Sequence, residues 1–83
     1  MALAVTLYST PGCTLCRYAR EDLELLAAEF PLQLCEVDVA ADRALAARFL
    51  LHVPVIEIAP TTLLFAPISL AQLRAALRDL QAV

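Results

Sequence analysis

Apolar residues change their spacing along the chain, and each change predicts a new element. Residues 3–8 form a continuous apolar run with β-branched and aromatic members, which predicts a short buried strand that ends at a Ser-Thr-Pro-Gly loop. From Thr14 onward, apolar residues recur at steps of three and four with charged residues between them, which predicts an amphipathic helix of about four turns. Its apolar stripe comprises Leu15, Tyr18, Ala19, Leu23, Leu26 and Ala27. A Phe-Pro pair at positions 30 and 31 should end this helix.

The second half of the chain predicts shorter elements. Residues 32–39 indicate a second strand, and its Gln33, Glu36 and Asp38 are typical of a partly exposed strand at a sheet edge. Asp42 is a suitable N-cap for a short helix through Leu50. In that helix, three residues should face inward: Leu45, Ala46 and Phe49.

The last third of the chain predicts a hairpin and a helix. Residues 54–58 and 62–65 are strands joined by a short turn, so they should pair antiparallel. Ser69 should cap the last helix, whose apolar stripe comprises Leu70, Leu73, Ala76, Leu77 and Leu80. The order β-α-β-α-β-β-α predicts an α/β fold with a four-stranded mixed sheet and three flanking helices. We expect residues 1–83 to form a single domain, because the chain is 61% hydrophobic and contains no linker-like or repeated segment.

Charge and hydropathy exclude several classes of function. The formal net charge is −3, and the six basic residues are all arginines scattered among acidic residues. We therefore predict no nucleic-acid partner, and we interpret most of these arginines as solvated surface residues. The longest apolar region, residues 49–67, contains His52, Glu57 and three prolines, so we predict no membrane span. Because the N-terminus does not resemble a signal peptide, we expect a cytoplasmic location.

Two cysteines stand where the first helix should begin. Cys13 follows the Pro-Gly loop, and Cys16 is one helical turn further on. Free backbone N–H groups and the helix dipole stabilise a thiolate at that position, so the pair suits thiol–disulfide exchange. Cys13 would be the exposed attacking thiolate and Cys16 the more buried resolving thiol. The alternatives are two core thiols, or a zinc site that uses Cys35 and His52 as well, although such scattered ligands are untypical of structural zinc.

Two segments together resemble a known family. The stretch from Leu7 to Cys16, Leu-Tyr-Ser-Thr-Pro-Gly-Cys-Thr-Leu-Cys, and the later His52-Val53-Pro54-Val55-Ile56 are similar to the glutaredoxin branch of the thioredoxin superfamily, in particular to short bacterial glutaredoxin-like proteins. The resemblance covers essentially the whole chain. It implies a thioredoxin/glutaredoxin fold and a cis peptide bond at Val53–Pro54. It also implies that the backbone of Val53 pairs with a bound peptide or with glutathione. We therefore predict a substrate-binding surface formed by Thr10, Pro11, Gly12, Val53 and Pro54, beside the catalytic Cys13 and Cys16.

The chain departs from that family where glutathione usually binds. Thr10 replaces a lysine that binds a glutathione carboxylate, which removes a contact worth roughly 1.5–3 kcal/mol. Phe65-Ala66-Pro67 replaces a Gly-Gly pair, and Leu15 replaces the usual aromatic residue between the cysteines. Thioredoxin features are missing too, since the chain contains no Trp and has Leu7 where thioredoxins carry a buried acid. We expect Glu57 to face water and Cys35 to be an inert core thiol. Two alternatives stay open at this point: His52 either tunes Cys13 electrostatically or makes an ordinary hydrogen bond, and Arg17 either favours the thiolate or points outward.

These features predict a thiol–disulfide oxidoreductase that reduces protein or mixed disulfides. Its partners would be a disulfide-containing protein or glutathione, with a reductase as electron donor, and the protein should be a monomer. We expect no tightly bound cofactor and no metal, and glutathione is a candidate reductant despite the missing contacts. Two alternatives remain: a binding module that keeps the fold without redox turnover, and a metal or iron–sulfur carrier.

Overall fold

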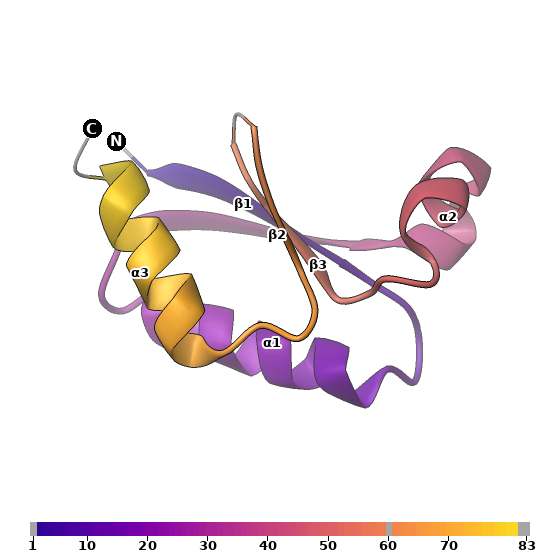
Figure 1. The fold of residues 1–83 in the computed structure, drawn as a ribbon, viewed down its shortest axis with the longest axis horizontal. Coiled ribbons are helices and arrows are strands. Elements are labelled where there is room, and N and C mark those ends of the chain that lie inside the picture. Colours follow the sequence, from indigo (N-terminus) through magenta and orange to yellow (C-terminus); the bar gives the residue numbers. More distant parts are fainter. Residues whose placement is uncertain (1, 60, 82–83) are drawn as a thin grey trace.

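A four-stranded mixed sheet runs through the computed structural model, which describes residues 2–59 and 61–81 (Figure 1). Its strands are β1 (Leu3–Ser9), β2 (Leu32–Asp38), β3 (Val55–Ile58) and β4 (Thr62–Phe65), in the spatial order β2-β1-β3-β4. β1 pairs with β2 in parallel and with β3 antiparallel, and β3 and β4 form the antiparallel hairpin expected from their short connection. The α/β fold predicted from the sequence is confirmed.

Helices cover the two faces of the sheet unequally. α1 (Thr14–Leu26) and α3 (Leu70–Gln81) lie together on one face, while α2 (Arg43–Phe49) lies near one end of the sheet, after the short 3₁₀ helix η1 (Val39–Ala41) (Figure 1). Successive residues of a strand point to opposite faces. Val5 and Leu7 of β1 therefore face α1 and α3, whereas Tyr8 packs with residues of α2.

The main core lies between the sheet and the pair formed by α1 and α3. It consists of Val5, Leu7, Ala19, Leu23, Leu26, Ile56, Ile58, Leu73 and Leu77. The predicted stripe of α3 is confirmed, but that of α1 is partly wrong. Leu15 and Tyr18 are 58% and 50% exposed, Ala27 is exposed at the C-cap, and Cys16 is buried instead. The buried positions of α1 follow the spacing of Cys16, Ala19, Leu23 and Leu26, which places Leu15 and Tyr18 on the outer side of the helix.

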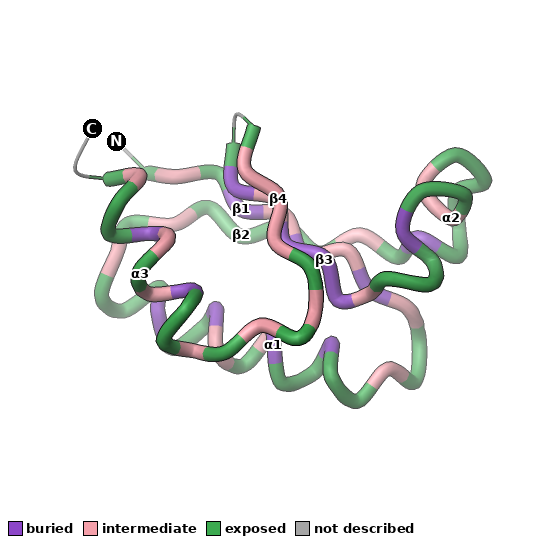
Figure 2. Tube along the Cα trace, viewed as in Figure 1, coloured by how far each residue is buried: buried purple, intermediate pink, exposed green. Residues whose placement is uncertain are grey.

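A smaller cluster on the opposite face joins α2 to the sheet. Val39, Phe49 and Val55 are buried there, and Tyr8, Leu45, Val53 and Leu63 pack around them. α2 is too short to cover the whole face, so most of β2, at the sheet edge, stays exposed (Figure 2). The prediction that Cys35 is a core thiol is therefore wrong: it pairs with Thr6, away from α1, and is exposed.

Polar side chains cap the helices as their sequence positions predict. The Asp42 carboxylate accepts a hydrogen bond from the Leu45 backbone N–H at 3.0 Å and begins α2. Before α3, the Ser69 hydroxyl accepts from the Gln72 backbone N–H at 3.1 Å, and the Gln72 side chain accepts from the Ser69 backbone N–H at 2.8 Å. This reciprocal pair is a capping box, which satisfies two backbone donors at the start of the helix.

Candidate functional site

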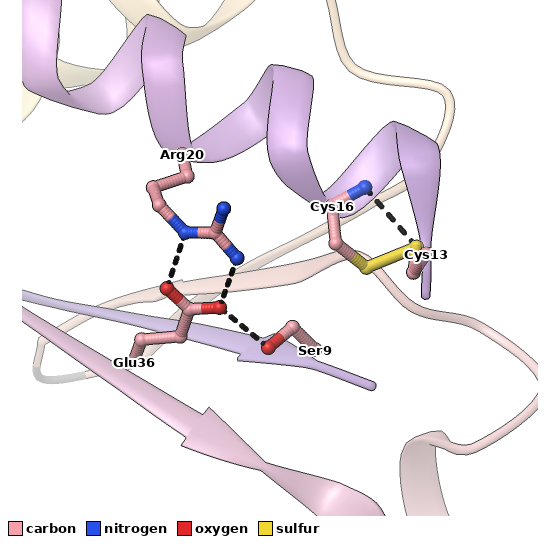
Figure 3. Close-up of a disulfide and its surroundings, with 5 residues drawn as sticks. All are labelled: Ser9, Cys13, Cys16, Arg20 and Glu36. Atoms are coloured by element: carbon pink, nitrogen blue, oxygen red, sulfur yellow. Dashed lines mark hydrogen bonds and ion pairs between the residues drawn. A yellow bond between two sulfur atoms is a disulfide. The ribbon is translucent and has the colours of Figure 1, made fainter. Parts of the chain in front are cut away.

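Cys13 and Cys16 form a disulfide at the start of α1 (Figure 3). Their Cα atoms are 5.2 Å apart. Cys13 is the N-cap residue of the helix, and its sulfur accepts a hydrogen bond from the Cys16 backbone N–H at 3.1 Å. Cys13 is half-buried, whereas Cys16 is fully buried. The two sulfurs therefore differ in accessibility, and the one in contact with solvent also receives a backbone donor at the positive end of the helix dipole.

A tight loop delivers Cys13 to this position. Gly12 has a φ of +79°, in the left-handed region that glycine adopts without steric cost. The Cys13 backbone N–H then donates to the Thr10 carbonyl at 3.3 Å, which closes a turn over Pro11 and Gly12. The Pro-Gly sequence thus redirects the chain from the end of β1 into the first turn of α1.

A groove of about 390 Å³, here called the dithiol groove, opens beside Cys13. Part of its wall is the loop expected from the sequence, with Thr10, Pro11 and Gly12. The rest comes from the end of β1, from α1 and from β2: Ser9, Cys13, Thr14, Arg17, Arg20, Glu36 and Asp38. The lining carries charges of both signs, and the volume is within the usual range of small-molecule sites, roughly 300–1,000 Å³.

A hydrogen-bonded network that the sequence reasoning missed forms one side of this groove. Arg20 binds Glu36 in a bidentate manner, with Nε and a terminal nitrogen each 2.6 Å from a carboxylate oxygen (Figure 3). The buried Ser9 hydroxyl donates to the same carboxylate at 2.8 Å. Arg20 stays partly exposed, as expected of a surface arginine, but it also binds Glu36. The sequence contains one clue to its placement beside the dithiol: Arg20 comes four residues after Cys16, and residues at that spacing share a helix face.

Hydrogen bonding from Arg20 holds the pKa of Glu36 below its ordinary value, although burial opposes that change. A further hydrogen bond from Ser9 and the nearby positive charge of Arg20 act in the same direction. The Arg20 pKa is raised, mainly by its hydrogen bond to Glu36. Both groups are therefore charged at neutral pH, and the groove contains a fixed pair of opposite charges.

Val53 and Pro54 lie outside the lining of the dithiol groove. The Val53–Pro54 peptide bond is cis, as is Ala66–Pro67. Pro54 is buried, and the half-buried Val53 packs in the cluster around Phe49. Of the five residues predicted to bind substrate, the structure places Thr10, Pro11 and Gly12 in the groove and Val53 and Pro54 outside it.

A second hollow, of about 450 Å³, lies between α2 and β4 and is lined by Arg48, Phe49, His52, Leu63 and Phe65. The His52 ring stands edge-on to the Phe65 ring, with centroids 5.9 Å apart. His52 therefore belongs to this aromatic hollow and not to the lining of the dithiol groove.

Glu57 does not simply face water, contrary to expectation. The Tyr8 hydroxyl donates a 2.7 Å hydrogen bond to it on the α2 side of the sheet. That hydrogen bond raises the pKa of Tyr8, and burial and the Glu57 charge add to the effect. Glu57 thus fixes the Tyr8 ring, which stacks on Phe49 at 4.8 Å.

The described residues do not assemble the nominal zinc site. Within residues 2–59 and 61–81, no three His, Cys, Asp or Glu side chains gather closely enough to hold a metal ion. Cys35 lies on the exposed edge strand, and His52 lies in the hollow between α2 and β4. The same part of the chain contains no helix long and apolar enough to cross a membrane.

Comparison with known proteins places the chain in a family. The model of the family described as "Glutaredoxin-like domain (DUF836)" matches residues 4–78. The chain belongs to this glutaredoxin-like family. A structural-genomics target protein from X. campestris is similar to this glutaredoxin-like domain, with 32% identity, a TM-score of 0.79, and coverage of 90% of this chain and 96% of the other.

Two more distant structures share the fold. A malarial protein has a TM-score of 0.75 at 17% identity, and the match covers 95% of this chain and 97% of the malarial chain. Oxidised thioredoxin O2 from Arabidopsis thaliana has a TM-score of 0.74 at 16% identity, and the match covers 95% of this chain and 75% of the thioredoxin chain. No curated protein matches the sequence. The glutaredoxin-like domain therefore has the thioredoxin fold, and its cysteine pair is consistent with thiol–disulfide redox chemistry.

Proposed function

We propose that this glutaredoxin-like domain is a thiol–disulfide oxidoreductase that uses Cys13 and Cys16 to reduce protein or mixed disulfides. The observation that carries the proposal is the asymmetry of the pair. Cys13 is accessible and its sulfur accepts a backbone hydrogen bond at the start of α1, whereas Cys16 is fully buried one turn later. An attacking thiol needs access and a stabilised thiolate, and a resolving thiol needs only proximity to the first sulfur.

The first step is an attack by the Cys13 thiolate on one sulfur of the substrate disulfide. A bond forms between Cys13 Sγ and that sulfur, the substrate S–S bond breaks, and the other substrate sulfur leaves as a thiolate that takes a proton from water. The backbone N–H of Cys16 and the dipole of α1 stabilise the attacking anion.

In the second step, Cys16 resolves the mixed disulfide. Its thiol loses a proton to solvent and attacks Cys13 Sγ, which forms the Cys13–Cys16 disulfide and releases the second substrate sulfur as a thiolate. The substrate gains two electrons and the cysteine pair loses two. Because Cys16 is fully buried, it reacts with the neighbouring Cys13 rather than with a second substrate molecule. An external thiol reductant then restores the dithiol by the reverse exchange.

Exposed apolar side chains on α1, before Val53 and on β4 favour a protein substrate over free glutathione. Leu15 and Tyr18 project from the first turns of α1, and Leu51 is 92% exposed just before Val53. Phe65 stands where the family usually has a glycine, and its ring lines the hollow beside His52 and is 48% exposed. A protein segment can cover these apolar groups, whereas the small polar glutathione molecule cannot.

The proposal also includes a location, an electron donor and an oligomeric state. We place the reaction in the cytoplasm, with a reductase or glutathione as the electron donor to the oxidised pair and with the monomer as the working form. Val53 would offer its backbone to an extended substrate segment.

A redox titration of the cysteine pair in glutathione buffers tests the proposed function. We expect a reversible two-electron transition in the wild type. Cys16→Ser should instead trap a mixed disulfide on Cys13. In a Cys35→Ser background, which removes the exposed third thiol, Cys13→Ser should neither turn over an insulin-type protein disulfide nor form an adduct. A Cys13 that alkylates no faster than a free thiol at neutral pH would contradict the proposal. A partner retained equally by wild type and Cys13→Ser would support a binding module in its place.

A further inference from the structure

We infer that Arg20 and Glu36 act together as positioning residues that set how well the Cys13 thiolate is stabilised, each cancelling the charge that the other would impose on the dithiol groove. The inference rests on the proposed function, because it concerns the reactivity of the same sulfur. It assigns a role to the network beside the disulfide, which the mechanism described above does not use (Figure 3).

Helix periodicity and strand pairing bring the two charges to the same groove as Cys13. Arg20 comes seven residues after Cys13, which is about two helical turns, so both residues line the groove from the same side of α1. Glu36 reaches the groove from β2, where it pairs with Leu7 of β1 on the face that α1 covers.

Three hydrogen bonds fix the Glu36 carboxylate in this position. One oxygen accepts from Arg20 Nε at 2.6 Å, and the other accepts from a terminal nitrogen of Arg20 at 2.6 Å and from the Ser9 hydroxyl at 2.8 Å. Ser9 is only 4% exposed, so its hydroxyl anchors the carboxylate from inside the protein. Because three hydrogen bonds hold the carboxylate, the pair acts on the groove from a defined position, although both side chains stay partly exposed.

The charges that line the groove balance. α1 contributes Arg17 and Arg20, and β2 contributes Glu36 and Asp38, so the lining has two positive and two negative side chains. Arg17 lies near the Tyr18 ring at 5.5 Å, and one Asp38 oxygen accepts from the Ala40 backbone N–H at 2.9 Å. Arg20 and Glu36 form the one direct ion pair among these four charged residues.

Breaking the pair from either side should therefore have opposite effects. Arg20→Met leaves an uncompensated carboxylate in the groove, which disfavours the Cys13 thiolate. Glu36→Gln leaves an uncompensated guanidinium, which favours it. Arg20 is about 10 Å along the helix from Cys13. A single uncompensated charge at about that distance in a largely aqueous environment shifts the pKa of the thiol by about half a unit. If the pair had only a structural role, both substitutions would shift the pKa of Cys13 in the same direction or not at all, because each removes the same link between α1 and β2.

The test is the pH dependence of Cys13 alkylation by iodoacetamide, a neutral reagent whose approach does not depend on the charge of the groove. It is measured on the reduced protein in a Cys16→Ser/Cys35→Ser background, because Cys35 is an exposed free thiol and would otherwise react as well. We expect Arg20→Met to raise the pKa of Cys13 by about half a unit, Glu36→Gln to lower it by a similar amount, and the double variant to return close to the starting value. Both shifts should shrink in high salt, which screens the free charge.

The chain offers a matched control in a second ion pair. Arg74 of α3 binds Glu29 with the same bidentate geometry and similar exposure, at the far end of α1. From the helical rise, this pair is roughly 20 Å from Cys13. Arg74→Met and Glu29→Gln should leave the pKa of Cys13 unchanged.

Shifts of equal sign in both single variants, or no shift in either, would overturn the inference. A failure of the proposed function gives a different result. In that case the Cys13 thiol of the parent protein alkylates like a free cysteine and the wild type shows no reversible disulfide, whatever the variants do.

Discussion

Phe49 attaches α2 to the rest of the protein, and its removal tests whether the two faces of the sheet unfold independently. It is the one buried residue of α2, at 3% exposure. Its ring lies 4.8 Å from that of Tyr8 and 6.5 Å from that of Phe65. We expect Phe49→Ala to release α2 while the main core stays folded.

The magnitude follows from the size of the helix and of the side chain. A helix of seven residues is not stable on its own in water, so α2 depends on its tertiary contacts. An aromatic side chain buries about 150–250 Å², worth roughly 4–6 kcal/mol at 25 cal/mol per Å². Phe-to-Ala substitutions in cores cost about 3–5 kcal/mol. That exceeds what the half-buried Leu45 and the Asp42 cap can supply, since a cap contributes about 1 kcal/mol.

Hydrogen exchange resolves the two regions. In Phe49→Ala, the amides of residues 46–50 should lose most of their protection, whereas those of the buried half of α1 should keep theirs. Leu26→Ala is the matched control, because Leu26 is fully buried in the main core and its loss should weaken protection throughout the molecule.

Two results would refute this reasoning. In the first, protection falls equally in α1 and α2 of Phe49→Ala, which would mean that the two clusters form one cooperative unit. In the second, the α2 amides keep their protection, which would mean that Phe49 does not hold the helix in place.

Three further expectations concern the ends of helices and the groove. Gly12→Ala should cost about 1–2 kcal/mol in urea unfolding, because φ is +79° while the space around a new Cβ is open, so backbone strain alone is responsible; an unchanged midpoint would contradict this. Ser69→Ala should cost about 1 kcal/mol through the lost bond to the Gln72 N–H, whereas Ser69→Asp should retain most of the stability. The pKa of Glu36 is lowered from 4.5 by Arg20, so its stabilising contribution is present above that pH and is lost as the pH falls through the lower folded value. The difference in Tm between wild type and Glu36→Gln should accordingly shrink on acidification below pH 4.5, and a difference that grows would have the wrong sign.

Local patterns in the sequence predicted most elements and their caps. The alternation of apolar runs and helical stripes, with Asp42 and Ser69 at helix starts, depends on residues close to one another in the chain. The position of Cys13 at the start of α1 follows from the same local signals, since the Pro-Gly loop precedes it and the helical period begins at Thr14. Edge exposure of β2 was also readable, because Gln33, Glu36 and Asp38 interrupt its apolar residues.

The errors concern residues whose surroundings come from distant segments. Cys35 follows Leu34 in the middle of a predicted strand, but α2 is too short to cover that strand, so the thiol is exposed. Glu57 looked like a solvated hairpin residue until the pairing of β1 with β3 brought the Tyr8 hydroxyl to it. Leu15 and Tyr18 fit a helical stripe as well as the buried residues do, and only the packing of α1 on the sheet decided which side faces the core.

The sequence by itself determined the order of the elements, the loop that ends at Gly12 and the place of the two cysteines on the first helical turn, because these depend on backbone conformation and on spacings of a few residues. Tertiary structure alone decided that Glu36 from β2 meets Arg20 from α1 beside Cys13, that Ser9 is buried beneath them, and that Val53 and Pro54 stay outside the groove. Such contacts join segments far apart in the chain, and they arise only when the sheet register and the packing of α1 bring those segments together.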